Sequence, residues 1–456
     1  MNKNFDSDSL ITRKEISGWG RRDFVNSKLV NLKSSYEITN FIKGSYSSSL
    51  ITRGLGRSYG DAAQLKEDFV LNVNFSKGIS LSGNQLTVGG GVTIDQLLEV
   101  IVPLGYFLPV TPGSAKVTIG GAIAADVHGK NHHKVGSLGN HVSRILLING
   151  RGDIEEIKLE LGQSDKKNNF FWATIGGMGL TGIILEATIS LIKIETSLMK
   201  VDTFICDDLE KLMDVMKLKD QDYTYSVSWI DSLHKKNRGV LTCGDHAKIQ
   251  EIDKGQSDLL SYNSKYLINA PKIIPNGLLN KFTVKAFNKL WFTKSNLSGK
   301  NIQTIPQFFY PLDGVNNWNR IYGSQGFYQY QFVVPDDKSY FIAKTLDTLK
   351  KSSAYSFLTV LKRLGKSNNA FLSFPQSGWT LSVDLPGFNI NILGVLKELD
   401  IELASIGGKL YLAKDSRQTP NMFRKSYPFY EKWRSIKQEM DPDNIFQSDL
   451  SRRLRI

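Results

Sequence analysis

The stretch Thr52-Arg-Gly-Leu-Gly-Arg-Ser-Tyr-Gly-Asp61 decides which fold the chain is expected to adopt. It follows a short apolar run, so we expect a strand that leads into a glycine-rich loop. Its spacing, Gly54-x-Gly56-x-x-x-Gly60, is one residue longer than the dinucleotide fingerprint of a Rossmann fold, and no apolar helix follows it. A loop rich in backbone N–H groups and flanked by Arg53 and Arg57 still suits a pyrophosphate. A simple turn between two strands is the competing interpretation.

Further glycine-rich stretches follow in the same part of the chain. Residues 1–192 hold 25 of the 39 glycines. Glycine lets a backbone approach a ligand closely, so we expect this part to cradle a ligand and the remainder to form a more regular sheet-and-helix domain. The two most informative stretches are Pro109-Val-Thr-Pro-Gly113 and Val117-Thr-Ile-Gly-Gly-Ala-Ile-Ala-Ala-Asp126. A flat ring or a diphosphate can lie against such a backbone, although tight packing between two elements would use the same residues.

Strands and helices are expected to mix without the regular alternation of a doubly wound sheet. Runs of apolar residues predict strands over residues 49–52, 85–88, 144–149, 181–191, 326–334 and 379–384. Thr93 and Gln96 form a capping-box pair and predict a helix that begins after Thr93.

Four of the six histidines fall between His128 and His141, in a run that begins His128-Gly-Lys-Asn-His-His133. A metal site is one interpretation. No acidic residue lies between Asp126 and Asp153, however, and the nearby cations Lys130, Lys134 and Arg144 would repel a metal ion. The better interpretation is a cationic polar pocket for an anionic ligand, with His128 as a polar contact or a proton-transfer group. We therefore expect no metal.

Composition limits the class of protein. The chain has 456 residues, so two domains are the natural expectation. Its two cysteines, Cys206 and Cys243, exclude a disulfide scaffold and a four-cysteine zinc site. No segment approaches the length of a transmembrane helix and no signal peptide is evident, so we expect a soluble cytoplasmic protein. The formal net charge of +13 leaves room for an anionic partner.

Taken together and in order, these motifs resemble flavoproteins of the vanillyl-alcohol-oxidase type, which carry a PCMH-type FAD-binding domain. Within that group the chain is similar to the decaprenylphosphoryl-β-D-ribose 2′-oxidase family. The similarity spans nearly the whole chain. Beyond the glycine stretches and the histidine run it includes Tyr223-Thr-Tyr-Ser-x-x-Trp229, Phe309-Tyr-Pro-Leu-Asp313, Trp318-Asn-Arg320, Gln329-Tyr-Gln-Phe332 and Tyr411-Leu-Ala-Lys-Asp-Ser-Arg417.

The resemblance implies an α+β fold with a two-lobed FAD-binding domain over residues 1–192. It implies a substrate domain with a large antiparallel sheet and flanking helices over residues 193–408, and a C-terminal segment, residues 409–456, that returns to the FAD domain. The family's FAD contacts fall on Arg53, Gly54, Leu55, Gly56, Arg57, Ser58, Tyr59, Gly60, Asp61, Gly113, Thr118, Ile119, Gly120, Gly121, Ala125, Asp126, Val127, His128, Ile184 and Tyr411.

The implied reaction is oxidation of the ribose 2-hydroxyl of a polyprenylphosphoryl ribose to a 2-keto sugar, the first half of an epimerisation that makes an arabinose donor for cell-wall glycans. Lys414 and His128 are the implied catalytic residues, and the sequence does not decide which of them is the base. Lys414 can act as a base only if its pKa is lowered. Otherwise it serves as an electrostatic clamp. The implied sugar-phosphate pocket consists of Tyr59, Lys130, Trp229, Tyr310, Arg320, Gln329, Gln331, Lys362 and Ser382.

Two departures from related sequences carry expectations of their own. Many relatives attach FAD covalently through a histidine in the first glycine loop, and Arg57 stands at that place, so we expect noncovalent FAD. Mycobacterial-type members carry a cysteine where this chain has Ser382, so thiol-directed covalent inhibitors are expected to fail here.

Other functions stay open at this point. One alternative is an FAD-linked oxidase of a soluble sugar, alditol or aldonolactone, and another is a flavin-free carrier that kept the fold. The family reaction also implies a separate NAD(P)H-dependent keto-sugar reductase as a partner. The prenyl length, the electron acceptor and the oligomeric state are not indicated by the sequence.

A basic segment gives the net charge a definite location. Between Leu259 and Leu312 there is no aspartate or glutamate, but there are seven lysines interspersed with apolar residues: Lys265, Lys272, Lys281, Lys285, Lys289, Lys294 and Lys300. Such a segment suits peripheral docking on an anionic membrane, here the inner face of a bacterial plasma membrane. A solvated loop is the competing interpretation. No nucleic-acid-binding motif is present, so no nucleic acid is expected.

Overall fold

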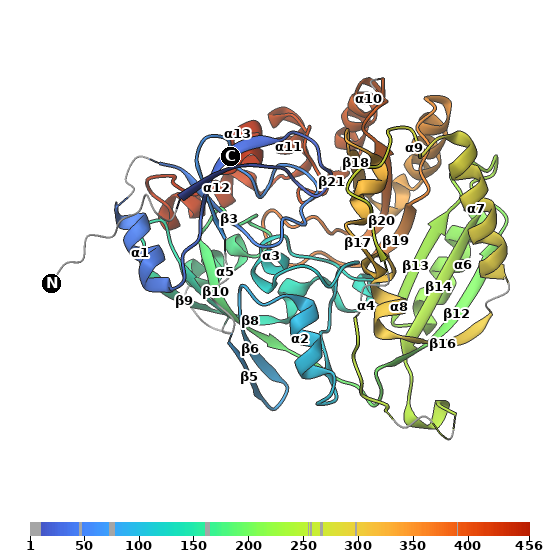
Figure 1. The fold of residues 1–456 in the computed structure, drawn as a ribbon, viewed down its shortest axis with the longest axis horizontal. Helices are drawn as coiled ribbons and strands as arrows, with labels where there is room; N and C mark the ends of the chain where they lie inside the picture. The colour runs from blue at the N-terminus through green and yellow to red at the C-terminus, as the bar shows by residue number, and fades with distance from the viewer. Residues whose placement is uncertain are drawn as a thin grey trace.

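The computed structural model describes residues 11–44, 48–72, 78–159, 165–253, 255, 258–264, 268–296, 299–389 and 391–456. Two lobes lie side by side in Figure 1. The left-hand lobe holds the early strands together with the last helices of the chain, and the right-hand lobe is built on a large sheet.

The left-hand lobe contains two separate sheets. The first is mixed: β1 and β2 are antiparallel, whereas β2 and β3 both run parallel to β4. Its order is β1 (Ile11–Ile16), β2 (Val25–Val30), β4 (Phe69–Asn72) and β3 (Leu50–Arg53), and helix α1 (Ser35–Gly44) belongs to the same region. The expected strand before the first glycine loop is therefore β3.

The second sheet is antiparallel throughout. Its order is β5 (Ile79–Ser82), β6 (Gln85–Gly89), β10 (Ile183–Ser190), β8 (Val142–Ile148) and β9 (Ile154–Lys158). Helix α2 (Ile94–Ile101) begins after Thr93, whose side chain accepts from the Gln96 N–H in the expected capping box. Three more helices follow: α3 (Ile119–Ala124), α4 (His132–Val135) and α5 (Asp165–Thr174).

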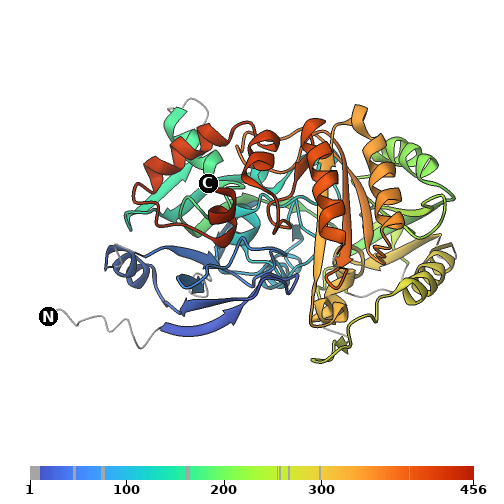
Figure 2. The ribbon, with the colours of Figure 1, turned by 90° about the horizontal axis from the view of Figure 1, so that it is seen from above.

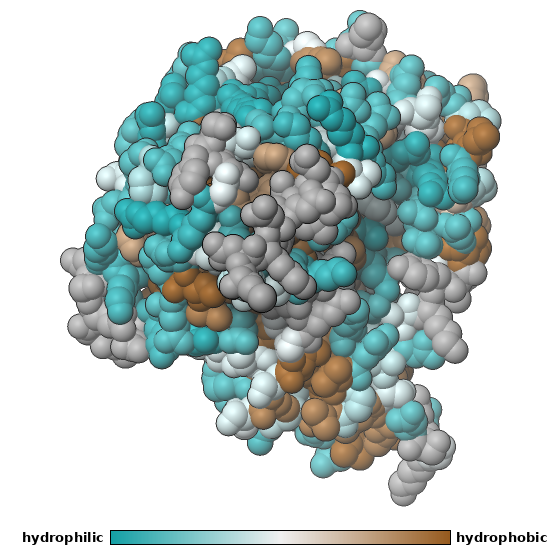
Figure 3. All heavy atoms as spheres, turned by 60° about the vertical axis from the view of Figure 1, so that its left-hand side comes forward, coloured by the Kyte–Doolittle hydropathy of each residue, from teal (hydrophilic) through white to brown (hydrophobic). Residues whose placement is uncertain are grey.

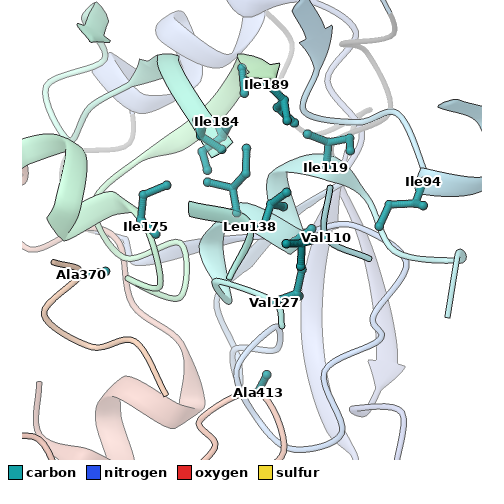
Figure 4. Close-up of a cluster of buried hydrophobic side chains, with 14 of the residues drawn as sticks. Ile94, Val110, Ile119, Val127, Leu138, Ile175, Ile184, Ile189, Ala370 and Ala413 are labelled. Atoms are coloured by element: carbon teal, nitrogen blue, oxygen red, sulfur yellow. The ribbon is translucent and has the colours of Figure 1, made fainter. Parts of the chain in front are cut away.

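The core of this lobe lies between the second sheet and the glycine-rich segments. Figure 4 shows Ile184 and Ile189 of β10 close to Ile119 of α3 and Leu138, with Ala413 from the C-terminal part of the chain at the edge of the cluster. Ile119 and Leu138 are fully buried. Burial of aliphatic side chains of this size contributes about 1.5–3 kcal/mol each, so the segments that carry the glycines are held firmly to the sheet.

The right-hand lobe is one eight-stranded sheet in which every neighbouring pair of strands is antiparallel. Its order is β16 (Lys300–Thr304), β12 (Leu198–Cys206), β14 (Gly239–His246), β13 (Tyr225–Ile230), β19 (Thr359–Leu364), β20 (Gly378–Pro386), β18 (Phe327–Val334) and β21 (Lys409–Leu410). The α+β class and the large antiparallel sheet expected from the sequence are confirmed.

The two faces of the large sheet are covered differently. Leu241, Phe332, Trp379 and Leu381 point to one face and are fully buried in a cluster with three helices: α6 (Leu209–Asp222), α9 (Tyr340–Lys351) and α10 (Ile392–Ser405). Helix α7 (Lys281–Asn296) lies on the other side of the sheet, next to β12 and β14 (Figure 2). Side chains alternate across a strand, so residues one position away from the buried set face α7 and the left-hand lobe.

The C-terminal helices return to the left-hand lobe, as Figure 1 shows. They are α11 (Pro420–Ser426), α12 (Tyr430–Met440) and α13 (Asp449–Leu454). The Leu50 N–H donates to the Ile445 carbonyl at 2.8 Å, and the Trp433 indole N–H donates to the Ala173 carbonyl at 3.0 Å. Further short elements are α8 (Ile305–Phe309) and the strand pairs β7 (Tyr106–Phe107) with β11 (Ile192–Lys193) and β15 (Ile268–Asn269) with β17 (Val315–Asn316).

Candidate active site

A cavity of about 1950 Å³ lies between the glycine-rich segments and the open face of the large sheet. Pockets for a single small molecule usually enclose about 300–1,000 Å³, so this cavity has room for a large cofactor and a substrate together. Most of the residues expected to bind FAD or substrate line it. From the FAD set these are Gly54, Leu55, Gly56, Arg57, Ser58, Tyr59, Gly113, Thr118, Gly120, Gly121, Ala125, Val127, His128, Ile184 and Tyr411.

The substrate and catalytic sets also converge on the cavity. Lys414, Lys130, Trp229, Tyr310, Gln329, Gln331, Lys362 and Ser382 line it. Six expected contact residues do not line the cavity: Arg53, Gly60, Asp61, Ile119, Asp126 and Arg320. Ile119 lies in the buried core of the left-hand lobe, and the places of the other five are described below.

The first glycine loop is fastened to the segment that carries Lys414. The Tyr59 N–H donates to the Ala413 carbonyl at 2.8 Å. A Cβ atom at Gly60 would lie 1.9 Å from the Asp415 carbonyl oxygen, so only glycine permits this approach. Gly60 therefore serves the packing of the two segments and does not itself line the cavity.

That packing places the Nζ of Lys414 3.4 Å from the centroid of the Tyr59 ring. Desolvation lowers the pKa of Lys414 to about 7, with the Asp384 carboxylate opposing the shift and the Lys362 ammonium adding to it. The Lys414 amine is thus poised between its charged and neutral forms near neutral pH.

Two further lysines bring positive charge to the same cavity. Desolvation lowers the pKa of Lys362 to about 8. Desolvation and the charge of Lys362 together lower the pKa of Lys130 to about 7, and the Lys130 Nζ donates to the Phe308 carbonyl and lies 4.2 Å from the Phe308 ring centroid. Three amines whose charged forms are disfavoured in this way form a good site for an anion, since an anion stabilises the protonated form of each.

His128 contacts the strand that carries the two glutamines. The Gln331 amide donates to the His128 Nε2 at 3.1 Å and to the Thr380 hydroxyl at 3.3 Å. Desolvation, together with the charges of Lys362, His132 and Lys414, lowers the pKa of His128 well below its usual value. His128 is therefore a neutral polar group at neutral pH.

The other histidines of the run turn to separate partners. The Gly365 N–H donates to the His132 Nδ1 at 3.0 Å, and the ring of His133 lies 3.3 Å from the Tyr223 carbonyl. The His141 ring lies 3.1 Å from the Val135 carbonyl. Within the part of the chain that the structure describes, no group of three or more His, Cys, Asp or Glu side chains is arranged to hold a metal ion.

Asp126 and Asp61 act inside the protein instead of at the cavity surface. Asp126 is fully buried and accepts from Ser137, Gly139, Asn368 and Ser373 at 2.5–2.9 Å. It therefore ties the histidine run to residues 368–373. Asp61 accepts two hydrogen bonds from the Arg453 guanidinium at 2.8 and 2.9 Å, and Arg453 also donates to Asp415 at 3.0 Å. Arg453 thereby joins the first glycine loop to the Lys414 segment.

The remaining expected residues have local partners. Arg53 donates to the Ala63 and Ser17 carbonyls at 2.7 and 2.8 Å, and Arg320 donates to the Ala270 carbonyl at 3.0 Å. The hydroxyls of Tyr310 and Thr111 lie 2.5 Å apart. The Trp229 indole donates to the Phe357 carbonyl at 2.8 Å, which leaves its ring to line the cavity.

Asp384 is a site residue that the sequence analysis did not single out. Its carboxylate is 1 % exposed and accepts from the Gln329 amide at 2.6 Å and the Tyr322 hydroxyl at 2.9 Å. Desolvation raises its pKa to about 6, although these two hydrogen bonds and the charge of Lys414 oppose the shift. One signal was available: Asp384 lies two residues after Ser382 on one strand, and so shares its face.

The glycine-rich wall fits an FAD cofactor. Gly113 lines the cavity, and a Cβ atom placed there would meet nothing within 4 Å, so its missing side chain leaves open space at the wall. A Cβ atom at Gly54 would lie 2.4 Å from the Thr118 hydroxyl, which brings the first glycine loop against the start of α3. A long, flat cofactor with a diphosphate suits this wall, because its glycines leave the backbone accessible and Arg57 lines the cavity beside them.

Comparisons with known proteins agree with this arrangement. Residues 28–158 match the family described as an FAD binding domain. The chain is 38% identical to the decaprenylphosphoryl-beta-D-ribose oxidase of Mycolicibacterium smegmatis, over 98% of both chains. It is 30% identical to an uncharacterized protein in the mprA 5′ region of Streptomyces coelicolor, over 80% of this chain and 100% of that one. A D-arabinono-1,4-lactone oxidase of Kluyveromyces lactis is 23% identical over 34% of this chain and 30% of its own length.

Proposed function

Because the chain belongs to the decaprenylphosphoryl-β-D-ribose oxidase family of FAD-dependent oxidoreductases, we propose that it oxidises the ribose 2-hydroxyl of a polyprenylphosphoryl-β-D-ribose to the 2-keto sugar. The observation that carries the proposal is the cluster of Lys130, Lys362 and Lys414 around one cavity, opposite the glycine-rich wall. A sugar phosphate needs both an anion site and a proton acceptor, and this cluster supplies both.

Bound FAD supplies the two-electron acceptor for the oxidation. The glycine wall would hold it, through the loop from Gly54 to Tyr59, Gly113 and the segment from Thr118 to Gly121. We propose noncovalent binding, because Arg57 cannot form a histidyl–flavin bond. Acid precipitation of the holoenzyme tests this: the flavin should stay in the supernatant, and flavin that precipitates with the protein would contradict the proposal.

We assign Lys414 as the group that takes the proton from the 2-hydroxyl. A general base works best when its pKa lies near the working pH, and the pKa of Lys414 is lowered to about 7. The pKa of His128 is lowered much further from neutrality by desolvation, so this imidazole is the weaker base. His128, held by Gln331, serves instead as a neutral polar contact beside the reacting groups.

Lys130 and Lys362 are assigned to the phosphate. Their charged forms are disfavoured by desolvation and, for Lys130, also by the charge of Lys362, so the monoanionic phosphodiester of the substrate relieves an existing cost. Gln329 is oriented by Asp384 and is assigned to the sugar. Tyr59, Trp229, Tyr310, Gln331 and Ser382 complete the proposed pocket, and Arg320 holds its rim through the Ala270 carbonyl.

We further propose the domain division given by the resemblance: residues 1–192 for FAD, 193–408 for the substrate and 409–456 returning to the FAD domain. The 2-keto product requires reduction at the same carbon to complete an epimerisation. A separate NAD(P)H-dependent reductase is the partner that this chemistry calls for.

A peripheral membrane contact belongs to the same proposal. Helix α7 exposes Phe282 by 83% and Leu290 by 70%, beside the exposed lysines 281, 285 and 289. Lys265 and the side chain of Lys300 fall outside the described residues. Figure 3, which brings the left-hand lobe forward and not α7, shows a mostly hydrophilic face with apolar side chains at its lower part and along its right edge. Across the described ranges, no helix combines the length and apolar character needed to cross a membrane.

Anaerobic bleaching of the bound flavin tests the proposed function. Farnesylphosphoryl-β-D-ribose, free ribose, an alditol and an aldonolactone are added in turn to the oxygen-free holoenzyme. We expect bleaching by the prenylphosphoryl ribose alone. Bleaching by the lactone or alditol instead would identify an oxidase of soluble sugars, and a purified protein without flavin absorbance would identify a carrier.

A further inference from the structure

We propose that the open face of the large sheet, under helix α7, binds the first prenyl units of the substrate in an apolar groove. This inference rests on the proposed function for the identity of the ligand. The groove, here called the sheet groove, is defined by Thr203, Val227, Val240, Thr242 and Val360 on the sheet and by Phe287 and Trp291 on α7. All seven residues line the cavity described above.

Strand register places the five sheet residues on one face. Thr203 pairs with Thr242, and Thr242 pairs with Val227 on its other side. Two residues along from this row, Val240 of β14 pairs with Trp229 of β13, and Trp229 pairs in turn with Val360 of β19. Paired residues point to the same face, so two rows of small or apolar side chains run across β12, β14, β13 and β19.

The groove continues directly from the cationic site. Val360 pairs with Ser382, and Lys362 pairs with Thr380 on the same neighbouring strand. Ser382 in turn pairs with Gln331, and Gln329 pairs with Asp384. One sheet face therefore passes from amides and a lysine at β18, β20 and β19 to aliphatic and hydroxyl-methyl side chains at β13, β14 and β12. A ligand with an anionic sugar head and an apolar tail matches this order.

These central strands are left partly uncovered on the cavity side. Val227 and Trp229 of β13 are half-exposed, whereas the intervening Ser226, Ser228 and Ile230 are buried. Thr203, Thr242 and Val360 are half-exposed as well. Apolar surface exposed in the middle of a sheet is a cost that a bound apolar chain removes.

Helix α7 forms the roof of the groove and is anchored from below. The Asn288 amide donates to the Asp231 carboxylate at 2.8 Å, and the Arg238 guanidinium carbon lies 3.9 Å from the centroid of the Phe292 ring. These contacts hold α7 so that Phe287 and Trp291, whose rings stack at 6.2 Å, line the cavity.

The groove is open at the edge of the sheet. Strand β16 is the edge strand next to β12, and its residues 301–303 line the cavity, with Ile302 exposed to solvent by 43%. A prenyl chain that runs from Val360 to Thr203 would cross three strand-to-strand spacings, about 14 Å. A few prenyl units fill that length, and the rest of a longer chain leaves past β16 on the side of the molecule where α7 lies.

Binding of prenyl monophosphates to the holoenzyme tests the groove without requiring oxidation. Calorimetry with dimethylallyl, geranyl and farnesyl phosphate should show Kd falling about tenfold with each added unit, since burying one such unit outweighs the roughly 1.4 kcal/mol that tenfold represents. Val227→Trp and Thr242→Trp fill the groove. In both, farnesyl phosphate should lose at least tenfold in affinity, while dimethylallyl phosphate stays within about threefold of the parent.

The matched control is Leu218→Trp, which adds the same ring at an exposed position of α6 on the other face of the sheet. Retained binding of dimethylallyl phosphate shows that a variant is folded, and Val227→Ser, which adds no bulk, gives a second test with an expected loss of about tenfold for farnesyl phosphate. Equal affinities for the three ligands in the parent, or an unchanged series in both tryptophan variants, would overturn the proposal. Prenyl-length dependence without flavin bleaching by prenylphosphoryl ribose would instead remove the proposed function and leave the groove standing.

Discussion

The Nζ of Lys414 lies 3.4 Å from the centre of the Tyr59 ring. Desolvation favours the neutral amine, the charge of Asp384 favours the ammonium form, and the charge of Lys362 adds to the effect of desolvation. The result is a pKa of about 7. Because the contact joins the first glycine loop to the C-terminal segment, the protonation of Lys414 depends on both ends of the chain being in place.

The pH dependence of the reaction should follow Lys414. If the neutral amine accepts the proton as proposed, kcat/KM, which reports the pKa of the free enzyme, should rise as the pH passes upward through about 7 and level off above it. Lys414→Arg stays protonated throughout this range, and should lose about 10²–10⁴-fold in kcat together with the rising limb. Steady-state rates between pH 5.5 and 9 measure this, and a clamp role for Lys414 would show the opposite slope, with activity falling as the pH rises.

Substitution of Asp384 or Lys362 should shift the rising limb of the pH–rate profile in opposite directions. Asp384 raises the pKa of Lys414, so Asp384→Asn should shift the rising limb to lower pH. Lys362 lowers the pKa of Lys414, so Lys362→Met should shift it to higher pH, in addition to raising KM through loss of a phosphate contact. Identical pH profiles in the two variants would show that Lys414 is not the group that titrates.

Removing Arg453 should destabilise the protein strongly. Arg453→Leu leaves Asp61 and Asp415, 7% and 6% exposed, without their common partner. Breaking a buried pair in this way costs about 3–5 kcal/mol. The adjacent Arg452 forms a more exposed ion pair with Asp68, so Arg452→Leu is a matched control with an expected cost of about 0–1 kcal/mol. Urea unfolding of the two holoenzymes measures the difference, and equal free energies of unfolding would contradict the assigned role of Arg453.

The residue at position 382 should decide whether a thiol-directed reagent forms an adduct in the cavity. Cys206 and Cys243 are 1% and 0% exposed, so the native protein should form no adduct with iodoacetamide. Ser382→Cys places a thiol on the cavity wall and should gain one adduct by mass spectrometry. An adduct at Ser382 itself in the unaltered protein would contradict this expectation.

Reversing charge on α7 should weaken binding to anionic vesicles. Each lysine near a membrane surface contributes about 1 kcal/mol to binding. The double substitution Lys285→Glu with Lys289→Glu should therefore weaken the affinity for phosphatidylserine vesicles, measured by flotation, by roughly 30-fold or more. Lys211→Glu with Lys217→Glu makes the same change of charge on α6, beyond the opposite face of the sheet, and should have little effect. If both pairs weaken binding equally, net charge and not α7 is responsible.

Local patterns were enough to predict the glycine loops and many strand positions. Thr93 capping α2 and the strand before Arg53 were expected because caps and apolar runs act over a few residues. Helix α3 was not expected, since two glycines disfavour a helix; the Thr118 cap and the packing of α3 against the second sheet stabilise it.

Contacts across the chain could not be predicted in the same way. Arg453 and Asp61 are separated by 392 positions, and nothing near either residue indicates the other. Asp384 orients Gln329 only through the register of β18 and β20. Arg53 and Asp126 carry the sequence pattern of ligand contacts, yet their side chains bind other parts of the protein, because loops that must meet a cofactor also have to be held in place.

The hydrogen bond from the Tyr59 N–H to the Ala413 carbonyl has a consequence for the order of events during synthesis on the ribosome. Every glycine loop has been synthesised once residue 192 leaves the ribosome, but at about 5–20 residues per second Lys414 follows roughly 10–45 s later. A nascent chain in that interval carries the loops without Lys414, the residue proposed as the base, which lies over the Tyr59 ring. A flavin bound in that interval would meet a site without the proposed base, so oxidation would have to wait until the Lys414 segment has joined the first glycine loop.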